Sequence, residues 1–111
     1  MKYMCLVYGE EQLTQTIDDR ECVANGEALR QAGHYVAAES LQPASTAATV
    51  RVRNGRVSVT DGPFAETKEM IAGFYLIEAR DLEEATALAA KIPPARVGAI
   101  EVRPVRELTG A

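Results

Sequence analysis

The sequence contains few of the residues on which common kinds of catalytic and metal chemistry depend. Its 111 residues include one histidine and two cysteines, Cys5 and Cys22. These thiols have neither the C-x-x-C pattern of redox motifs nor the spacing of metal ligands, so we expect both to be reduced and to pack as small apolar side chains. One histidine and scattered carboxylates fit no common metal site. We therefore expect no metal and no cofactor.

An excess of positive charge and a long apolar run are also missing. The formal net charge is −4, whereas non-specific binding to nucleic acid depends on a basic surface that displaces counterions from phosphates. The apolar stretch after Met1-Lys2 is broken at Gly9-Glu10-Glu11, which is too early for a signal-peptide core or a membrane span. We expect a cytoplasmic protein that binds neither nucleic acid nor membrane.

The spacing of apolar residues predicts an alternation of strands and helices. Asp18 and Asp81 are suited to cap helix N-termini, and Gly33 suits the exit of the first helix. A hairpin is also predicted, because Asn54-Gly55 between alternating valines is typical of a two-residue type I′ turn. The predicted elements are strands over 2–8, 34–41, 73–78 and 98–105, helices over 18–32 and 81–91, and a hairpin over 50–59.

The order of these elements predicts a single α+β domain over residues 1–111. Two βαβ halves with a hairpin between them form a ferredoxin-like βαβ-hairpin-βαβ plan. Two helices cover only one face of such a sheet, whereas the strands over 2–8 and 73–78 are apolar on both faces. A second copy of the sheet is the simplest cover for the other face. We therefore expect a homodimer, built as a dimeric α+β barrel.

The hairpin register brings arginines together. The register that the turn sets pairs Val52 with Val57. On the opposite face it pairs Arg53 with Arg56, and Arg51 is next in line. Like charges so placed repel, unless water screens them at the hairpin tip or an anion neutralises them. That anion is the carboxylate of Glu66 or Glu69 in the same chain, a carboxylate of a dimer partner, or a ligand with a carboxylate or phosphate group.

The segment after the hairpin combines a turn with several charges. Asp61-Gly62-Pro63 is strong turn chemistry, because Asp folds back onto backbone N–H groups, Gly permits positive φ and Pro fixes φ. We expect Phe64 to pack into the core and to anchor this turn. We expect Lys68 to pair with its flanking carboxylates, Glu66 and Glu69, rather than to act as a nucleophile.

Asp61 and His34 are the candidates for proton transfer. In a partly desolvated cleft, Asp61 acts as a general acid or base. His34 is its natural partner, because the unperturbed pKa of histidine is about 6.5. Two alternatives remain: Asp61 only braces its turn, and His34 is an exposed or capping residue at a strand entry. The candidate ligand-binding residues are Arg51, Arg53, Phe64, Glu66 and Lys68.

The chain resembles the DGPF branch of the YCII-related family. The segments that carry the resemblance are 60–69, with its Asp61-Gly62-Pro63-Phe64 motif, and 1–4, 33–34, 39–43, 49–53, 73–78 and 101–105. The resemblance implies a dimeric ferredoxin-like α+β barrel from bacteria without an established biochemical role. Enzymatic activity is suggested for the wider family, because some members hold a His and an Asp together in a cleft. Some DGPF proteins are associated with extracytoplasmic-function sigma factors, which implies such a partner here.

Three functions fit these features. The first is a small-molecule-binding or regulatory module, with a cleft for a small anionic metabolite near the Asp61-Gly62-Pro63-Phe64 turn. The second is a cofactor-free enzyme that acts on an acidic small molecule, with Asp61 and His34 transferring protons. The third is a structural dimerisation domain. We place binding ahead of catalysis, because the chain has one histidine, no Gly-x-Ser-x-Gly, and no complete set of nucleophile, base and orienting group.

Overall fold

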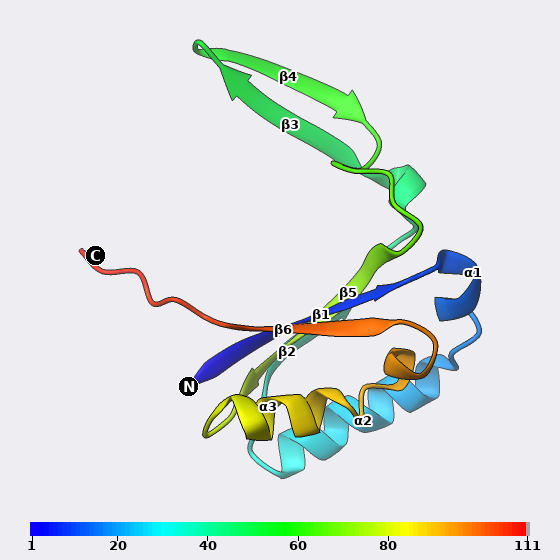
Figure 1. The fold of residues 1–111 in the computed structure, drawn as a ribbon, viewed down its shortest axis with the longest axis vertical. Coiled ribbons are helices and arrows are strands. Elements are labelled where there is room, and N and C mark those ends of the chain that lie inside the picture. The colour runs from blue at the N-terminus through cyan, green and yellow to red at the C-terminus, as the bar shows by residue number, and fades with distance from the viewer. Residues whose placement is uncertain (111) are drawn as a thin grey trace.

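The fold is a four-stranded sheet with helices on one face and a separate hairpin on the other side, as seen in a computed structural model that describes residues 1–110 (Figure 1). The elements are β1 (Lys2–Gly9), α1 (Glu11–Thr14), α2 (Asp19–Gln31), β2 (Tyr35–Ser40), η1 (Ala44–Thr46), β3 (Ala48–Arg53), β4 (Arg56–Asp61), β5 (Met70–Glu78), α3 (Leu82–Ala89), η2 (Pro93–Arg96) and β6 (Ala99–Pro104). Among these residues, no helix has the length and apolarity needed to cross a membrane.

The sheet has the order β2-β5-β1-β6, and every neighbouring pair of strands is antiparallel. Helix α2 connects β1 to β2, and α3 connects β5 to β6, so each helix links two strands that are not neighbours. This is the split βαβ arrangement of a ferredoxin-like fold. The predicted α+β fold class is confirmed.

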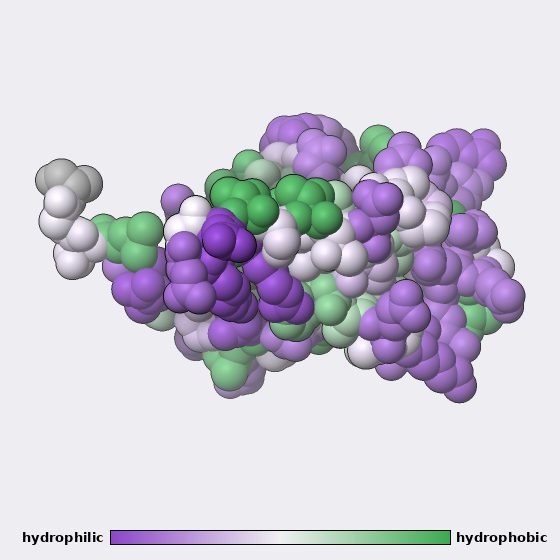
Figure 2. Space-filling model, turned by 90° about the horizontal axis from the view of Figure 1, so that it is seen from above, coloured by the Kyte–Doolittle hydropathy of each residue, from purple (hydrophilic) through white to green (hydrophobic). Residues whose placement is uncertain are grey.

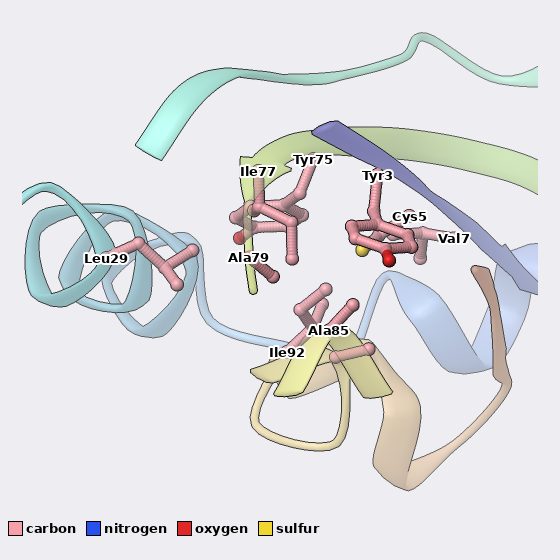
Figure 3. Packing of buried hydrophobic residues seen from close by; sticks show 10 residues of the cluster. Tyr3, Cys5, Val7, Leu29, Tyr75, Ile77, Ala79, Ala85 and Ile92 are labelled. Carbon is pink, nitrogen blue, oxygen red and sulfur yellow. The ribbon is translucent and has the colours of Figure 1, made fainter. Parts of the chain in front are cut away.

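The core lies between the two central strands and the helices (Figure 3). Alternate residues of β1 and β5 point toward the helices, and Cys5 and Ile77 among them are almost completely buried. Ala85 and Ala89 let α3 approach the sheet closely, because neither carries a side chain beyond Cβ. The core residues are Tyr3, Cys5, Val7, Leu29, Tyr75, Ile77, Ala79, Ala85, Ala89 and Ile92.

The other face of the sheet is also apolar but carries no helix. Met4 and Leu6 of β1, and Phe74 and Leu76 of β5, occupy the alternate positions and are half-buried. Helices α2 and α3 lie on the opposite side of the sheet (Figure 1). The expectation of two apolar faces on these strands is therefore confirmed, and one of those faces is open in the single chain.

The helix ends follow the predicted capping pattern. The Asp18 carboxylate accepts the backbone N–H of Arg20, and Asp81 accepts that of Glu84. Gly33 follows the C-terminal cap of α2 with φ of +83°, a conformation that costs glycine little. Helix α3 ends at Ala89, two residues before the predicted end.

The hairpin forms in the predicted register. Val52 pairs with Val57, and Arg53 pairs with Arg56. The turn residues Asn54 and Gly55 have φ of 52° and 74°, as a type I′ turn requires. Strands β3 and β4 form a two-stranded sheet of their own that projects away from the main sheet (Figure 1). We call residues 48–61 the arm.

Substitution of Gly73 tests how closely the backbones of β2 and β5 approach each other. A Cβ atom at Gly73 would lie 2.6 Å from the Glu39 carbonyl oxygen and 3.2 Å from Ser40 Cα. Because both are backbone atoms, Gly73→Ala is expected to lower the free energy of unfolding by about 1–3 kcal/mol in urea titrations. Gly26→Ala is the control, because a Cβ there meets only Tyr35 Cε2 at 3.8 Å. It should raise stability by up to about 1 kcal/mol. Equal stability of the two variants would contradict the close approach.

Candidate functional site

The turn after the arm is held by the backbone and by one hydroxyl. The N–H of Gly62 donates to the Ala47 carbonyl at 2.7 Å, and Thr49 Oγ1 donates to the Gly62 carbonyl at 2.9 Å. Asp61 is exposed, and its carboxylate makes no hydrogen bond within residues 1–110. The interpretation that the Asp61 carboxylate braces the turn is therefore wrong for the single chain. The carboxylate stays free for another contact.

His34 lies far from Asp61. The His34 ring Nδ1 is 2.8 Å from the Glu78 carbonyl oxygen, and the backbone N–H of Glu78 donates to the His34 carbonyl at 2.8 Å. His34 is thus fixed at the C-terminal end of β5, whereas Asp61 precedes its N-terminal end at Met70. Strand β5 spans roughly 26 Å at about 3.3 Å per residue. A single chain does not bring the proposed proton-transfer pair together.

The arginines of the arm have no acidic partner within residues 1–110. Arg53 Nη1 donates to its neighbouring Val52 carbonyl at 3.0 Å. The Arg51 guanidinium lies over the Phe64 ring, 5.1 Å from the ring centroid, which is a cation–π contact. Phe64 is 76% exposed. The expectation that Phe64 packs into the core is wrong, because the segment after β4 runs beside the arm and not against the helices.

The charges after Phe64 do not pair as expected. Lys68 Nζ lies 4.0 Å from Glu10 Oε1, so its partner comes from the end of β1 and not from Glu66 or Glu69. Glu66 is exposed. The proposed neutralisation of the arm by Glu66 or Glu69 is therefore absent from the single chain.

An open cleft of about 740 Å³ lies beside this segment. It is lined by Tyr8, Glu10, Thr67, Lys68, Glu69, Ala99, Ile100 and Glu101. Three carboxylates face one ammonium group here, so the local charge is negative. Such a charge opposes the binding of the small anionic metabolite that the sequence suggested.

A second concavity, of about 700 Å³, lies between α2 and the strands β2 and β5. We call it the helix groove. Gly26, Ala38 and Gly73 contribute small residues to its lining, and Tyr35 and Tyr75 contribute aromatic rings. Gly26 sits inside α2, where it weakens the helix, and its lack of a side chain leaves space beside Tyr35. Sequence reasoning missed this groove, although a glycine in the middle of a helix was the available signal.

Two of the four charged side chains at the rim of the helix groove pair with each other. The Arg30 guanidinium lies over the Tyr35 ring at 4.4 Å, and Arg30 Nη1 contacts Glu27 Oε2 at 3.0 Å. Asp19 and Glu39 are exposed at the same rim. Carboxylates thus outnumber the guanidinium group, which disfavours a strongly anionic ligand.

The Cys22 thiol and the Tyr75 hydroxyl, which line the helix groove, stay uncharged at neutral pH. The Tyr75 hydroxyl donates to the Cys22 carbonyl at 3.4 Å, and burial raises the pKa of Tyr75. Burial, followed by the negative charges of Asp19 and Glu21, also raises the pKa of the Cys22 thiol. Burial raises the pKa of Cys5 to about 11. Both thiols are therefore protonated, and neither supplies the thiolate that nucleophilic chemistry requires.

Within residues 1–110, no three or more side chains of His, Cys, Asp and Glu are grouped closely enough to bind a metal ion.

The stability of the Asp61→Asn variant shows whether the Asp61 carboxylate holds the turn or only lies on the surface. Because Asp61 is exposed and makes no hydrogen bond, the variant should unfold within about 0.5 kcal/mol of the wild type. Thr49→Val removes the hydroxyl that donates to Gly62 and should cost about 1 kcal/mol in the same urea titration. A larger loss for Asp61→Asn than for Thr49→Val would show that the carboxylate holds the turn.

Comparison with known proteins identifies the family to which the chain belongs. Residues 1–109 match the YCII-related domain. The chain is also 37% identical over 114 residues to an uncharacterized protein of Rhizobium meliloti (strain 1021), and the match covers 95% of this chain and 92% of that protein. Membership of the DGPF branch stays a prediction. Both matches extend over nearly the whole sequence, and the chain therefore belongs to the YCII-related domain family.

Proposed function

We propose that the protein is a small-molecule-binding module whose ligand occupies the helix groove. The observation that supports this most strongly is the composition of a cavity of about 700 Å³, whose lining combines small residues and two tyrosine rings with four charged residues, Asp19, Glu27, Arg30 and Glu39. Ligand sites in proteins are typically concavities of this size, mostly apolar, with a few polar groups that orient the ligand. The acidic cleft beside Lys68 fits that description less well.

The residues of the groove favour a flat and largely apolar ligand. Gly26, Ala38 and Gly73 leave room for a ring, and Tyr35 and Tyr75 offer aromatic surfaces for packing. The Tyr75 hydroxyl is a neutral hydrogen-bonding group beside that space. An uncharged aromatic molecule suits this combination better than the acidic metabolite expected from the arginines, because the rim is richer in carboxylates than in cations.

Binding is favoured over catalysis by the protonation states of the groove. A general base must lose its proton near the working pH. Cys22 and Tyr75 are two of the titratable groups that line the groove, and both have raised pKa values and keep their protons. His34 and Asp61 lie outside the groove lining. The groove therefore offers packing and hydrogen bonds but no activated nucleophile.

A fragment screen with uncharged aromatic compounds such as indole tests this proposal. Two-dimensional amide NMR should show shifts concentrated on the groove residues of α2, β2 and β5. Gly26→Leu should abolish them, because Leu fills the space beside Tyr35 while leucine is the better helix former. The matched control Gly26→Ala adds only a methyl group and should retain most of the binding.

Two outcomes of the fragment screen would contradict the proposal. Fragments that bind Gly26→Leu as tightly as the wild type, or that shift only residues of the arm, would place ligand binding elsewhere. An absence of any shift at millimolar fragment concentration would remove the groove as a binding site.

A further inference from the structure

The two ends of the helix groove differ in polarity. In the middle of α2, Gly26 leaves space beside the Tyr35 ring. Helix α2 and strand β2 are joined by residues 32–34 and pack against each other, so the start of α2 and the end of β2 lie at the same end of the groove. We call it the polar end, because the residues that line the groove from these segments are Thr14, Gln15, Asp19 and Ser40.

The polar end carries a carboxylate without a counter-ion. Asp19 is exposed, and its side chain makes neither an ion pair nor a hydrogen bond within residues 1–110. Its charge is felt inside the groove, because burial and then the negative charge of Asp19 raise the pKa of the Cys22 thiol in the lining. The guanidinium group of Arg30 is already engaged by Glu27 at 3.0 Å and by the Tyr35 ring. The charge of Asp19 therefore favours a cation.

The other side chains of the polar end offer neutral hydrogen-bond acceptors. The Thr14 hydroxyl donates to the Glu11 carbonyl at 3.3 Å, which leaves its oxygen lone pairs free to accept. Ser40 pairs with Gly73, two residues from Tyr75, so the Ser40 side chain points to the helix side of the sheet. An ammonium group has three donors and no acceptor. One carboxylate among hydroxyl oxygens therefore matches an ammonium group.

We propose that the ligand of the helix groove is an arylalkylamine, an aromatic ring that carries a primary ammonium group on a short chain. The ring packs beside Gly26 and Tyr35, and the ammonium group contacts Asp19. Gly26 follows Asp19 by seven residues of α2, which is about 10 Å along the helix axis. A two-ring aromatic system with an ethylamine chain has a similar length. The inference rests on the function proposed above and adds the charge of the ligand and the residue that recognises it.

An aromatic ring with a negative charge has a different surface to bind. The arm carries Arg51, Arg53 and Arg56, which make no ion pair with any of residues 1–110. Figure 2 looks at the molecule from the side on which the arm projects, and hydrophobic residues lie there directly beside strongly hydrophilic ones. The helix groove lies among α2, β2 and β5. The charge of the ligand therefore distinguishes the groove from the arm.

Amide NMR titration with three indole derivatives of similar length tests the charge. Tryptamine carries an ammonium group, tryptophol a neutral hydroxyl group and indole-3-acetate a carboxylate. In the helix groove, tryptamine should bind about threefold to tenfold more tightly than tryptophol at low salt, and indole-3-acetate most weakly. The advantage of tryptamine should decrease at high salt, because the Asp19 carboxylate is exposed.

Asp19→Asn identifies the residue that recognises the ammonium group. This variant should bind tryptamine no more tightly than tryptophol, and its affinity for tryptophol should equal that of the wild type. Glu39→Gln is the matched control. Glu39 is also exposed and borders the groove, but it pairs with Phe74 on the open face of the sheet, so its side chain points away from α2. Glu39→Gln should keep the preference for tryptamine.

The outcomes separate this inference from the proposed function. If tryptophol shifts the groove residues, the arylalkylamine is overturned by equal affinity for tryptamine, by a preference that Asp19→Asn retains, or by tryptamine shifts confined to the acidic cleft beside Lys68. Each of these results leaves the groove as a binding site for uncharged rings. Groove residues that shift with none of the three compounds would overturn the proposed function and this inference together.

Discussion

The antiparallel pairing of β1 with β5 is the constraint on which the remaining structure depends. The two strands form the centre of the sheet. Along each strand, successive apolar side chains point to opposite faces of the sheet, so both faces are apolar. One set, including Cys5 and Ile77, is covered by α2, α3 and the turn that contains Ile92. The other set has no helix above it. The two helices α2 and α3 cover only one face of the sheet, and the apolar residues of the other face are the reason that a homodimer is predicted.

The arm is a second consequence of the same arrangement. Since the main sheet is complete with β2, β5, β1 and β6, the inserted hairpin has no neighbouring strand and projects from the sheet. Its valines are exposed, and its arginines make no ion pair with any of residues 1–110. Open apolar faces and separated charges of opposite sign are the features on which the prediction of a homodimer depends. The helix groove, by contrast, is formed within one chain and needs no partner.

Local patterns predicted local structure well in this chain. Asn54-Gly55 and the alternating valines determine the hairpin register, and Asp18 and Asp81 determine where helices begin, because each depends on a few neighbouring residues. Phe64 was assigned to the core wrongly, because nothing nearby in sequence shows that its segment leaves the main sheet. The separation of His34 from Asp61 depends on the length of β5, and the helix groove depends on the space that Gly26 leaves beside Tyr35. Such distances are properties of the assembled fold.

The two apolar faces of the central strands predict a homodimer, and hydrogen–deuterium exchange at several protein concentrations tests that prediction most directly. Amides of β3 and β4 that pair across the hairpin should be protected at high concentration and should lose that protection on dilution, while amides of β1 and β5 exchange at constant rates. Arm amides that exchange rapidly at every concentration, or that stay equally protected after dilution to the monomer, would contradict the account.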